Sequence, residues 1–273
     1  MRFTLLTPTY NRAPYVERVY KGLCAQTFHD FEWVIIDDGS ADNTRELVAT
    51  WKPFFPIRYY WKPNGGKHTA VNMGVTKAEG EFIVMMDSDE QPVPYMLERF
   101  DYHWKQIPNP ERFSTLVALL FSEDGVTVLG DRFPQEVFDV FDIGEALKLA
   151  KCDLGGIVRT DLFKKFLYPE FKNERYMAEG VVWNRLMRRY GSRYVNEPLK
   201  LAGYAPGGLG RSGDLRYSNP KGAVVYNAEL AFSRKIPLRV RTKAAVTAVY
   251  FSMVAVGRDI RLFFSRRGKK NNN

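Results

Sequence analysis

Short apolar runs alternate with longer stretches of helical spacing through the first third of the chain. The apolar runs predict strands at residues 3–6, 33–36, 57–61 and 82–86. Apolar residues at helical spacing between these runs predict helices at about 14–25, 43–51 and 68–77. Regular alternation of strand and helix is typical of an α/β protein, with a mostly parallel sheet covered by helices on both faces.

The pattern becomes less regular after residue 92. It predicts a helix at 94–106, a buried strand at 116–121, a hairpin at 124–128 and a strand at 153–158. Shorter helices are expected at 147–151 and 161–166, and another begins at Glu179. Residues 133–141 carry mixed signals and receive no assignment.

The apolar run at 82–86 ends on two acidic residues, Asp87 and Asp89. Alternation along a strand points both side chains to the same side, where two like charges repel. A divalent cation between them removes that repulsion, and Mg²⁺ or Mn²⁺ binds carboxylate oxygens together with phosphate oxygens. The pair therefore indicates a metal site that holds a diphosphate, with a solvated acidic turn as the alternative.

Polar, turn-forming residues follow three of the predicted strands, at 7–11, 37–40 and 87–89. In parallel sheets ligands bind beyond the carboxyl ends of the strands. We therefore expect one ligand site at this edge of the sheet.

The length of 273 residues suits one large domain, or one domain with an appendage. Its two cysteines, Cys24 and Cys152, form no disulfide framework and favour a reducing compartment. The chain begins directly with a strand, so we expect no secretory signal peptide and a cytoplasmic location.

The formal net charge of +9 is concentrated at the carboxyl end. Eleven Lys and Arg residues follow position 233 against one acid, Asp259, which leaves the rest nearly neutral and argues against a nucleic-acid binder. The apolar run at 244–257 is shorter than the roughly 20 residues of a membrane span. Basic flanks with aromatic residues predict one or two helices that lie in the interface of an anionic membrane. The alternative is a helix packed on the main domain with a solvated basic end.

Four motifs together resemble those of family 2 glycosyltransferases: TPTYNR at 7–12, IIDDGS at 35–40, NGGK at 64–67 and MDSD at 86–89. The resemblance covers about the first 200 residues. It implies the GT-A fold, a Rossmann-like, mostly parallel, doubly wound sheet, here with a helical extension at the carboxyl end. It also implies a nucleotide-diphospho-sugar donor, a Mn²⁺ or Mg²⁺ cofactor and inversion at the anomeric carbon. We expect a catalytic domain at 1–205, a flexible lid or linker at 206–235 and a basic membrane-associating tail at 236–273.

The resemblance also implies roles for individual residues. Thr9 would lie beside the nucleotide, Asp38 would accept a hydrogen bond from uracil or ribose, and Asp87 and Asp89 would serve the ribose side and the metal. Family members often carry Arg before the Asn of the helix at 68–77, where this chain has Val71, so Lys67 is expected to supply the positive charge. The full set of expected donor contacts is Thr7, Pro8, Thr9, Asn11, Asp38, Gly65, Lys67, Asn72, Asp87, Ser88 and Arg211.

The catalytic base expected from the resemblance is Glu179, at the start of a helix. Family members often carry an acidic pair there, and this chain has Gly180 in the second place. Asp153, next to Gly155 and Gly156, is the alternative base. The Gly- and Ser-rich stretch at 204–222 is read as a lid whose Arg211 or Arg216 reaches a phosphate.

The expected function is transfer of a sugar, most simply from a UDP-sugar, to a glycan or glycolipid in cell-surface polysaccharide or lipopolysaccharide synthesis. The basic tail indicates an acceptor at the inner face of the plasma membrane. A sugar-1-phosphate nucleotidyltransferase is the alternative enzyme, although the turn at 7–12 lacks the glycine that its phosphate loop needs. A non-catalytic, peripheral membrane protein that binds nucleotide-sugars is the third reading.

Overall fold

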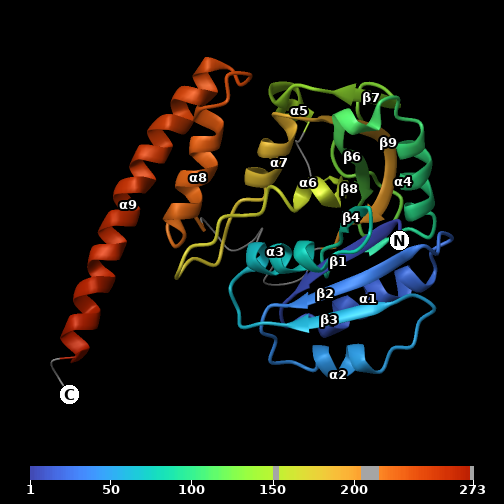
Figure 1. Ribbon diagram of the computed structural model, residues 1–273, viewed down its shortest axis with the longest axis horizontal. Coiled ribbons are helices and arrows are strands. Elements are labelled where there is room, and N and C mark those ends of the chain that lie inside the picture. The colour runs from blue at the N-terminus through green and yellow to red at the C-terminus, as the bar shows by residue number, and fades with distance from the viewer. Residues whose placement is uncertain (150–153, 204–214, 271–273) are drawn as a thin grey trace.

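The computed structural model describes residues 1–149, 154–203 and 215–270, with the backbone alone for 262–270. These residues form a central sheet in the order β3-β2-β1-β4-β8-β6-β9-β5, and β7 pairs with β9 (Figure 1). The strands are β1 (Phe3–Thr9), β2 (Phe31–Asp37), β3 (Ile57–Trp61), β4 (Phe82–Met85), β5 (Gln91–Pro92), β6 (Phe113–Phe121), β7 (Val137–Val140), β8 (Gly155–Arg159) and β9 (Gly191–Leu201).

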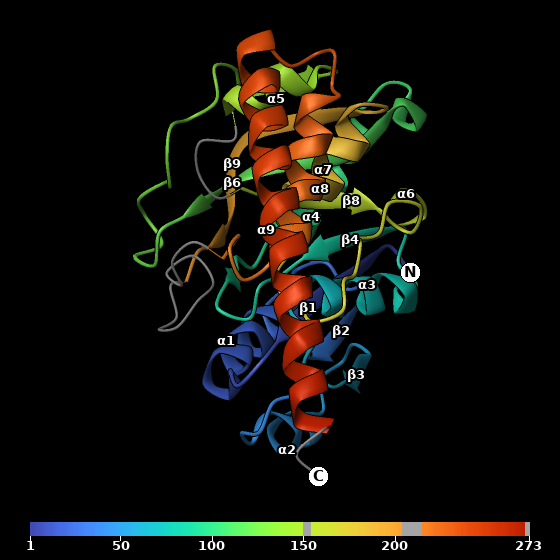
Figure 2. The same cartoon turned by 90° about the vertical axis from the view of Figure 1, so that its left-hand side faces the viewer.

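Helices cover both faces of this sheet, and the last two helices of the chain lie beside it (Figures 1 and 2). They are α1 (Ala13–Cys24), α2 (Thr44–Ala49), α3 (Lys67–Lys77), α4 (Met96–Lys105), a 3₁₀ turn (Pro110–Arg112), α5 (Ile143–Leu149), α6 (Thr160–Phe163), α7 (Gly180–Met187), α8 (Pro220–Ala231) and α9 (Leu238–Lys270).

Strands β3, β2, β1 and β4 are mutually parallel, so their carboxyl ends share one edge of the sheet. Beyond β4 the sheet is mixed: β8 runs antiparallel to both β4 and β6, and β9 runs parallel to β6. The α/β fold class and the common edge for the strand ends are thus confirmed.

Alternate residues of the parallel strands enter two different cores. Leu5 and Trp33 lie in the core beneath α1 and α4, whereas their neighbours Leu6 and Val34 pack with residues of α3 and α7. All four side chains are fully buried. A strand buried on both faces needs apolar residues at every position, which is why these strands are continuous apolar runs in the sequence.

Strand β9 was not predicted, because its sequence is largely polar. Its polar side chains find partners far along the chain: Arg193 donates to Asp139 of β7, Asn196 donates to the carbonyl of Phe133, and Lys200 pairs with Glu90. β7 lies within the unassigned stretch 133–141 and pairs with β9. These strands are thus held by long-range polar contacts that no local pattern reveals.

The predicted linker at 206–235 contains helix α8, which Pro220 begins in the first helical turn. Ala244 of α9 and Leu230 of α8 pack with Ile143 and Ile236 in a small separate core. α9 is a single helix of 33 residues that stands at the outer side of the molecule, with α8 beside it (Figures 1 and 2). Among the described residues, no helix combines the length and apolar character required to cross a bilayer.

Glu197 of β9 ties helix α4 to the sheet and makes this contact sensitive to acid. Its carboxylate accepts from Arg99 Nε at 2.8 Å, and His103 Nε2 lies 2.8 Å away. Burial alone would raise the pKa of Glu197, but the hydrogen bonds from Arg99 and His103 lower it to about 2. Because the pKa of Glu197 is lowered in the folded protein, its ionised carboxylate stabilises the fold fully at pH values above the ordinary pKa of 4.5. This stabilisation is lost as the pH falls toward 2.

Replacing Glu197 by Gln is therefore expected to lower the Tm by about 2–4 °C at pH 7, which corresponds to about 1 kcal/mol. The difference between wild type and variant should shrink from pH 5 to pH 3, as measured by thermal unfolding at each pH. Glu17→Gln, which removes an exposed partner of Lys21 on α1, is the matched control. A difference that stayed constant with pH would contradict the assignment.

Candidate active site

Asp38, which follows β2, holds the loop at 64–66 over the carboxyl edge of the sheet. Its Oδ1 accepts from Lys62 Nζ at 2.6 Å and from the Gly65 amide at 2.9 Å, and its Oδ2 accepts from the Gly66 amide at 2.7 Å. The Asp38 residue is only 4% exposed. Asp38 was expected to contact uracil or ribose; in this structure its oxygens shape the glycine loop that borders the site.

Lys67, the first residue of α3, joins two of the predicted site residues. Its ammonium lies 2.7 Å from Asp87 Oδ2 and 2.6 Å from Glu179 Oε1, a partner 112 positions away. Burial would lower the pKa of Lys67, but the charges of Asp87 and Glu179 outweigh it and hold the pKa well above its ordinary value. The same contact lowers the pKa of Asp87 against the opposing effect of its burial. Lys67 is therefore a firmly charged bridge at the centre of the site.

The start of α3 suits an anionic group. Gly66 occupies the N-cap position, where no side chain caps the helix, and its φ of +95° is a conformation that favours glycine. The amino end of a helix carries partial positive charge, and Lys67 adds a full charge there. A diphosphate placed beside Lys67 would thus meet two favourable electrostatic contributions.

Asp89 lies close to the first helix and to the segment after β9. Arg12 Nη1 is 3.7 Å from Asp89 Oδ2. A Cβ on Gly203 would come within 1.8 Å of the Asp89 carbonyl oxygen, so only glycine allows this approach. Gly203, which follows β9, therefore packs closely against the predicted metal ligand Asp89.

Within the described residues, the predicted metal site offers the carboxylates of Asp87 and Asp89. No group of three or more His, Cys, Asp or Glu residues arranged for a metal occurs in the described parts of the chain. Mg²⁺ and Mn²⁺ sites in phosphate-transfer enzymes commonly use one or two carboxylates together with substrate phosphates. The hard oxygen donors of Asp87 and Asp89 fit that arrangement.

The predicted site residues at the end of the first strand differ in whether their side chains already have partners. The Thr7 hydroxyl accepts from Trp33 Nε1 inside the core, and Pro8 is buried. Asn11 links two turns, because its backbone N–H donates to Ser40 Oγ and its side-chain Oδ1 accepts from the backbone N–H of Ala41. The Thr9 hydroxyl is buried and lacks a hydrogen-bond partner within the described residues, so Thr9 is the member of this group with spare hydrogen-bonding capacity.

Asn72 has its amide engaged in supporting the neighbouring loop. Its Nδ2 donates to the Tyr168 carbonyl and to Glu170, and its Oδ1 accepts from the Tyr168 amide. The Asn72 side chain therefore positions the loop that precedes Glu179. Ser88, between the two acids, is 9% exposed.

Gly180 follows the predicted base, where the resemblance led us to expect a second acid. A Cβ at this position would lie 2.8 Å from a ring carbon of Tyr226 in α8. The packing of α8 against α7 therefore explains the glycine and the single acid.

Sequence reasoning missed three cations of the site, Lys62, Arg12 and Lys200. Lys62 directly follows β3 and pairs with Asp38. Because ligands bind beyond the carboxyl ends of parallel strands, the position of Lys62 after β3 could have identified it. Lys200 donates to Glu90 at 2.6 Å and to the carbonyl of Met85, two residues before Asp87, at 2.9 Å. It belongs to the unpredicted strand β9, and no local signal marks it. The alternative base Asp153 and the predicted phosphate contact Arg211 lie outside the described residues.

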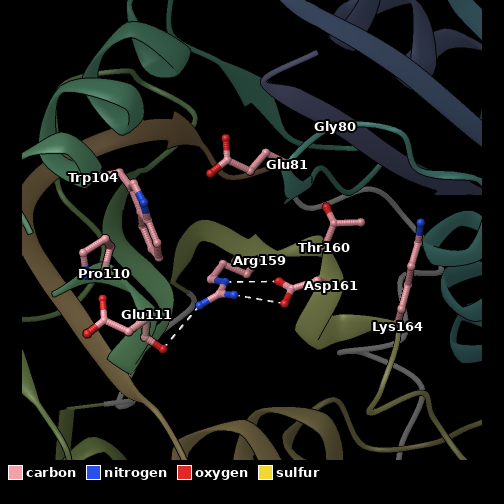
Figure 3. Close-up of a pocket in the computed structure, with 9 residues that line it drawn as sticks. All are labelled: Gly80, Glu81, Trp104, Pro110, Glu111, Arg159, Thr160, Asp161 and Lys164. Carbon is pink, nitrogen blue, oxygen red and sulfur yellow. Dashed lines mark hydrogen bonds and ion pairs between the residues drawn. The ribbon is translucent and has the colours of Figure 1, made fainter.

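A cavity of about 600 Å³ lies at the opposite edge of the sheet (Figure 3). It is lined by Gly80 and Glu81, which precede β4, together with Trp104 and Arg159. Arg159 points toward Asp161 and pairs with it (Figure 3). Because it borders the amino end of β4, this cavity is separate from the site around Asp87.

Comparison with known proteins identifies similar sequences and similar folds. Residues 4–115 match the sequence profile described as Glycosyl transferase family 2. An uncharacterised glycosyltransferase from Nostoc is 35% identical over 101 residues, which are 36% of this chain and 31% of that protein. A GalNAc(5)-diNAcBac-PP-undecaprenol beta-1,3-glucosyltransferase from Campylobacter jejuni is 32% identical over 97 residues, 33% of this chain and 30% of that protein. The chain thus spans less than a third of the length of these relatives.

Two solved structures share the fold over nearly the whole chain. TarS 1-349 from S. aureus, in complex with UDP-GlcNAc, has a TM-score of 0.69 at 20% identity and covers 92% of this chain and 71% of its own. The mannosyltransferase PcManGT from Pyrobaculum calidifontis, in complex with GDP-Man and Mn²⁺, has a TM-score of 0.58 at 17% identity and covers 99% and 83%. Both similarities concern the GT-A fold.

Proposed function

We propose that this chain, whose residues 4–115 match the sequence profile of glycosyl transferase family 2, is an inverting glycosyltransferase. The donor is a nucleotide-diphospho-sugar, with a UDP-sugar favoured because TarS binds UDP-GlcNAc on the same fold. The acceptor is a hydroxyl group of a glycan or glycolipid.

The observation that carries this proposal is the Lys67 bridge. It brings Asp87, at the end of β4, and Glu179, at the start of α7, to one ammonium group beside the glycine loop. A diphosphate that binds at this helix start would take over Lys67 as a counter-charge, which leaves the Glu179 carboxylate free for the acceptor.

Glu179 is the general base in the proposed reaction. Its carboxylate takes the proton from the acceptor hydroxyl, and the acceptor oxygen forms a bond to the anomeric carbon. The bond from that carbon to the diphosphate oxygen breaks on the opposite face, and the electron pair leaves with the nucleoside diphosphate. Attack opposite to the leaving group inverts the anomeric centre.

Asp89, together with Asp87, would hold Mn²⁺ or Mg²⁺ when the donor is bound. Such an ion neutralises charge on the leaving diphosphate. PcManGT, which shares the fold, binds its donor together with Mn²⁺. Thr9, with its unpartnered buried hydroxyl, is proposed to bind the nucleotide.

We further propose a lipid-linked acceptor, as in cell-surface polysaccharide or lipopolysaccharide synthesis. The Campylobacter jejuni relative is named for an undecaprenol-linked acceptor. The positive carboxyl-terminal region suits an anionic membrane surface. The protein would then work in the cytoplasm, at the inner face of the plasma membrane.

Thermal unfolding with UDP-, GDP- and dTDP-sugars, each with and without Mn²⁺, tests the donor class. At a donor concentration of 100 times its Kd, the Tm should rise by about 5–10 °C, because binding to the native state adds about 2.7 kcal/mol. Asp89→Asn should remove the part of this rise that depends on Mn²⁺. Asp30→Asn, at an exposed carboxylate that precedes β2 and so lies at the opposite end of this strand from Asp38, should retain it. If none of these nucleotide-sugars raised the Tm, the proposed donor class would be wrong.

A further inference from the structure

The outer face of α9 carries a continuous apolar stripe. We define the outward stripe as Val246, Val249, Met253, Val256 and Ile260, which follow one another at alternating intervals of three and four residues. This spacing places them on one side of the helix. Their exposed fractions run from 51% for Ile260 to 66% for Val246 and Met253.

The opposite face of α9 is fixed to the protein, so the outward stripe cannot turn inward. Ala244, Phe251 and Ala255 are each at least 93% buried on that side. Arg258 pairs with the buried Glu174 at 2.5 Å, and Asp259 of α9 pairs with Lys221 of α8 at 2.7 Å. These contacts hold the stripe on the exposed face of α9. The helix itself stands at the outer side of the molecule (Figure 2).

Positive charges accompany the outward stripe. Arg239 lies one heptad before Val246, Lys243 lies three residues before it, and Arg261 follows Ile260; all three are exposed. Asp259 is the one acidic residue in the sequence of α9, and it is used by Lys221. Two copies paired along this stripe would set these cations against each other without acidic partners. An anionic lipid surface instead matches both the apolar residues and the charge.

We propose that the outward stripe docks α9 flat on an anionic lipid bilayer, with Arg239, Lys243 and Arg261 at the level of the headgroups. This differs from the sequence expectation in which the whole tail associates with lipid, because here one defined helix face does so and the other face holds the catalytic domain.

The docked orientation brings the bilayer toward the candidate active site. Arg258 of α9 contacts Glu174, and the neighbouring Arg175 packs against Gly66 of the glycine loop. The start of α3 and the carboxyl end of β3 also lie on the side of the domain that faces α8 and α9 (Figure 1). This orientation deepens and rests on the proposed function with a lipid-linked acceptor, whose headgroup would reach the site from the same membrane.

Vesicle co-sedimentation of the full chain tests the docking. Wild type should bind vesicles rich in phosphatidylglycerol at least about tenfold more tightly than pure phosphatidylcholine vesicles. The double variant Val249→Asp and Met253→Asp should lose about tenfold or more of this binding. Val126→Asp, at a valine of the β6–β7 connection that is even more exposed than Val249 and Met253, should bind as wild type does.

Three results would overturn the docking: wild type that binds neither vesicle, a stripe variant that binds as wild type does, or a wild-type dimer in sedimentation velocity that the stripe variant dissociates. The last of these would assign the stripe to a second copy. The Tm of each variant and its rise with UDP-sugar, measured in parallel, report folding and the donor site. Vesicle binding without any donor effect would thus contradict the proposed function and leave the docking surface in place.

Discussion

Replacing Glu179 by Gln is expected to lower the kcat of sugar transfer by about 10²–10⁴-fold, because the amide cannot accept the acceptor proton. Glutamine keeps the size of the side chain, and its oxygen can still accept from Lys67. The side chain of Glu179 is 58% exposed, so its replacement should leave the Tm nearly unchanged. The assay is UDP release from the UDP-sugar that stabilises the protein most, with a polyprenyl-diphosphate-linked sugar as acceptor.

The affinity for the donor distinguishes a variant that has lost the catalytic base from one that has lost the donor site. In the Glu179→Gln variant the donor Kd from thermal unfolding should stay within about threefold of wild type, because a general base acts in the chemical step. The alternative base gives the matched control: Asp153→Asn should retain most of the activity. If Asp153→Asn abolished turnover while Glu179→Gln kept it, the base would be Asp153 and Lys67–Glu179 would be a structural ion pair.

The edge of the sheet that bears the site could be predicted because its signals are local. Residues 82–86 are apolar on both faces since β4 is buried between two cores, and Asp87 follows where the core ends. Turn residues mark the ends of β1 and β2 in the same way. Each of these features depends only on neighbours in the sequence, and the parallel order of the strands then brings them together.

The connections between these features could not be predicted, because they join distant parts of the chain. No pattern indicates that the Lys67 ammonium lies between Asp87 and Glu179, or that Asp38 uses both its oxygens on the loop at 64–66. The polar sequence of β9 likewise conceals a strand whose Lys200 pairs with Glu90. In each case the stabilising ion pair or hydrogen bond needs a partner that only the completed fold brings near.

For α9 the sequence likewise predicted the properties of the segment but not its arrangement in the fold. The sequence contained the apolar run and the basic residues, and it predicted membrane association for the whole tail. It did not predict which residues face outward, because that depends on which side of α9 packs against α8. The burial of Phe251 and Ala255 assigns the packed side, and the outward stripe follows from it.

Gly66→Ala is expected to lower both the Tm and the affinity for the donor. An alanine at φ +95° and ψ +155°, a conformation that essentially only glycine adopts, costs about 1–3 kcal/mol, which corresponds to about 2–12 °C in Tm. The new Cβ would also lie 1.9 Å from the Arg175 carbonyl oxygen, so the loop at 64–66 or the segment at 174–176 has to move. Movement of the loop breaks its hydrogen bonds to Asp38 and shifts the start of α3. The Tm rise produced by UDP-sugar should therefore disappear in this variant.

Two other glycine variants show whether this effect belongs to the loop. Gly257→Ala adds a Cβ on α9 with nothing within 4 Å, so it should keep the Tm or raise it slightly through better helix propensity. Gly65→Ala would place a Cβ 2.7 Å from Thr69 Oγ1 and 2.9 Å from Lys62 Nζ, and these flexible side chains can move aside. Gly65→Ala should therefore lose less stability than Gly66→Ala. If Gly66→Ala unfolded at the wild-type temperature and still bound the donor, the tight packing of Gly66 against Arg175 would not be what positions Lys67, and the site would tolerate a different loop.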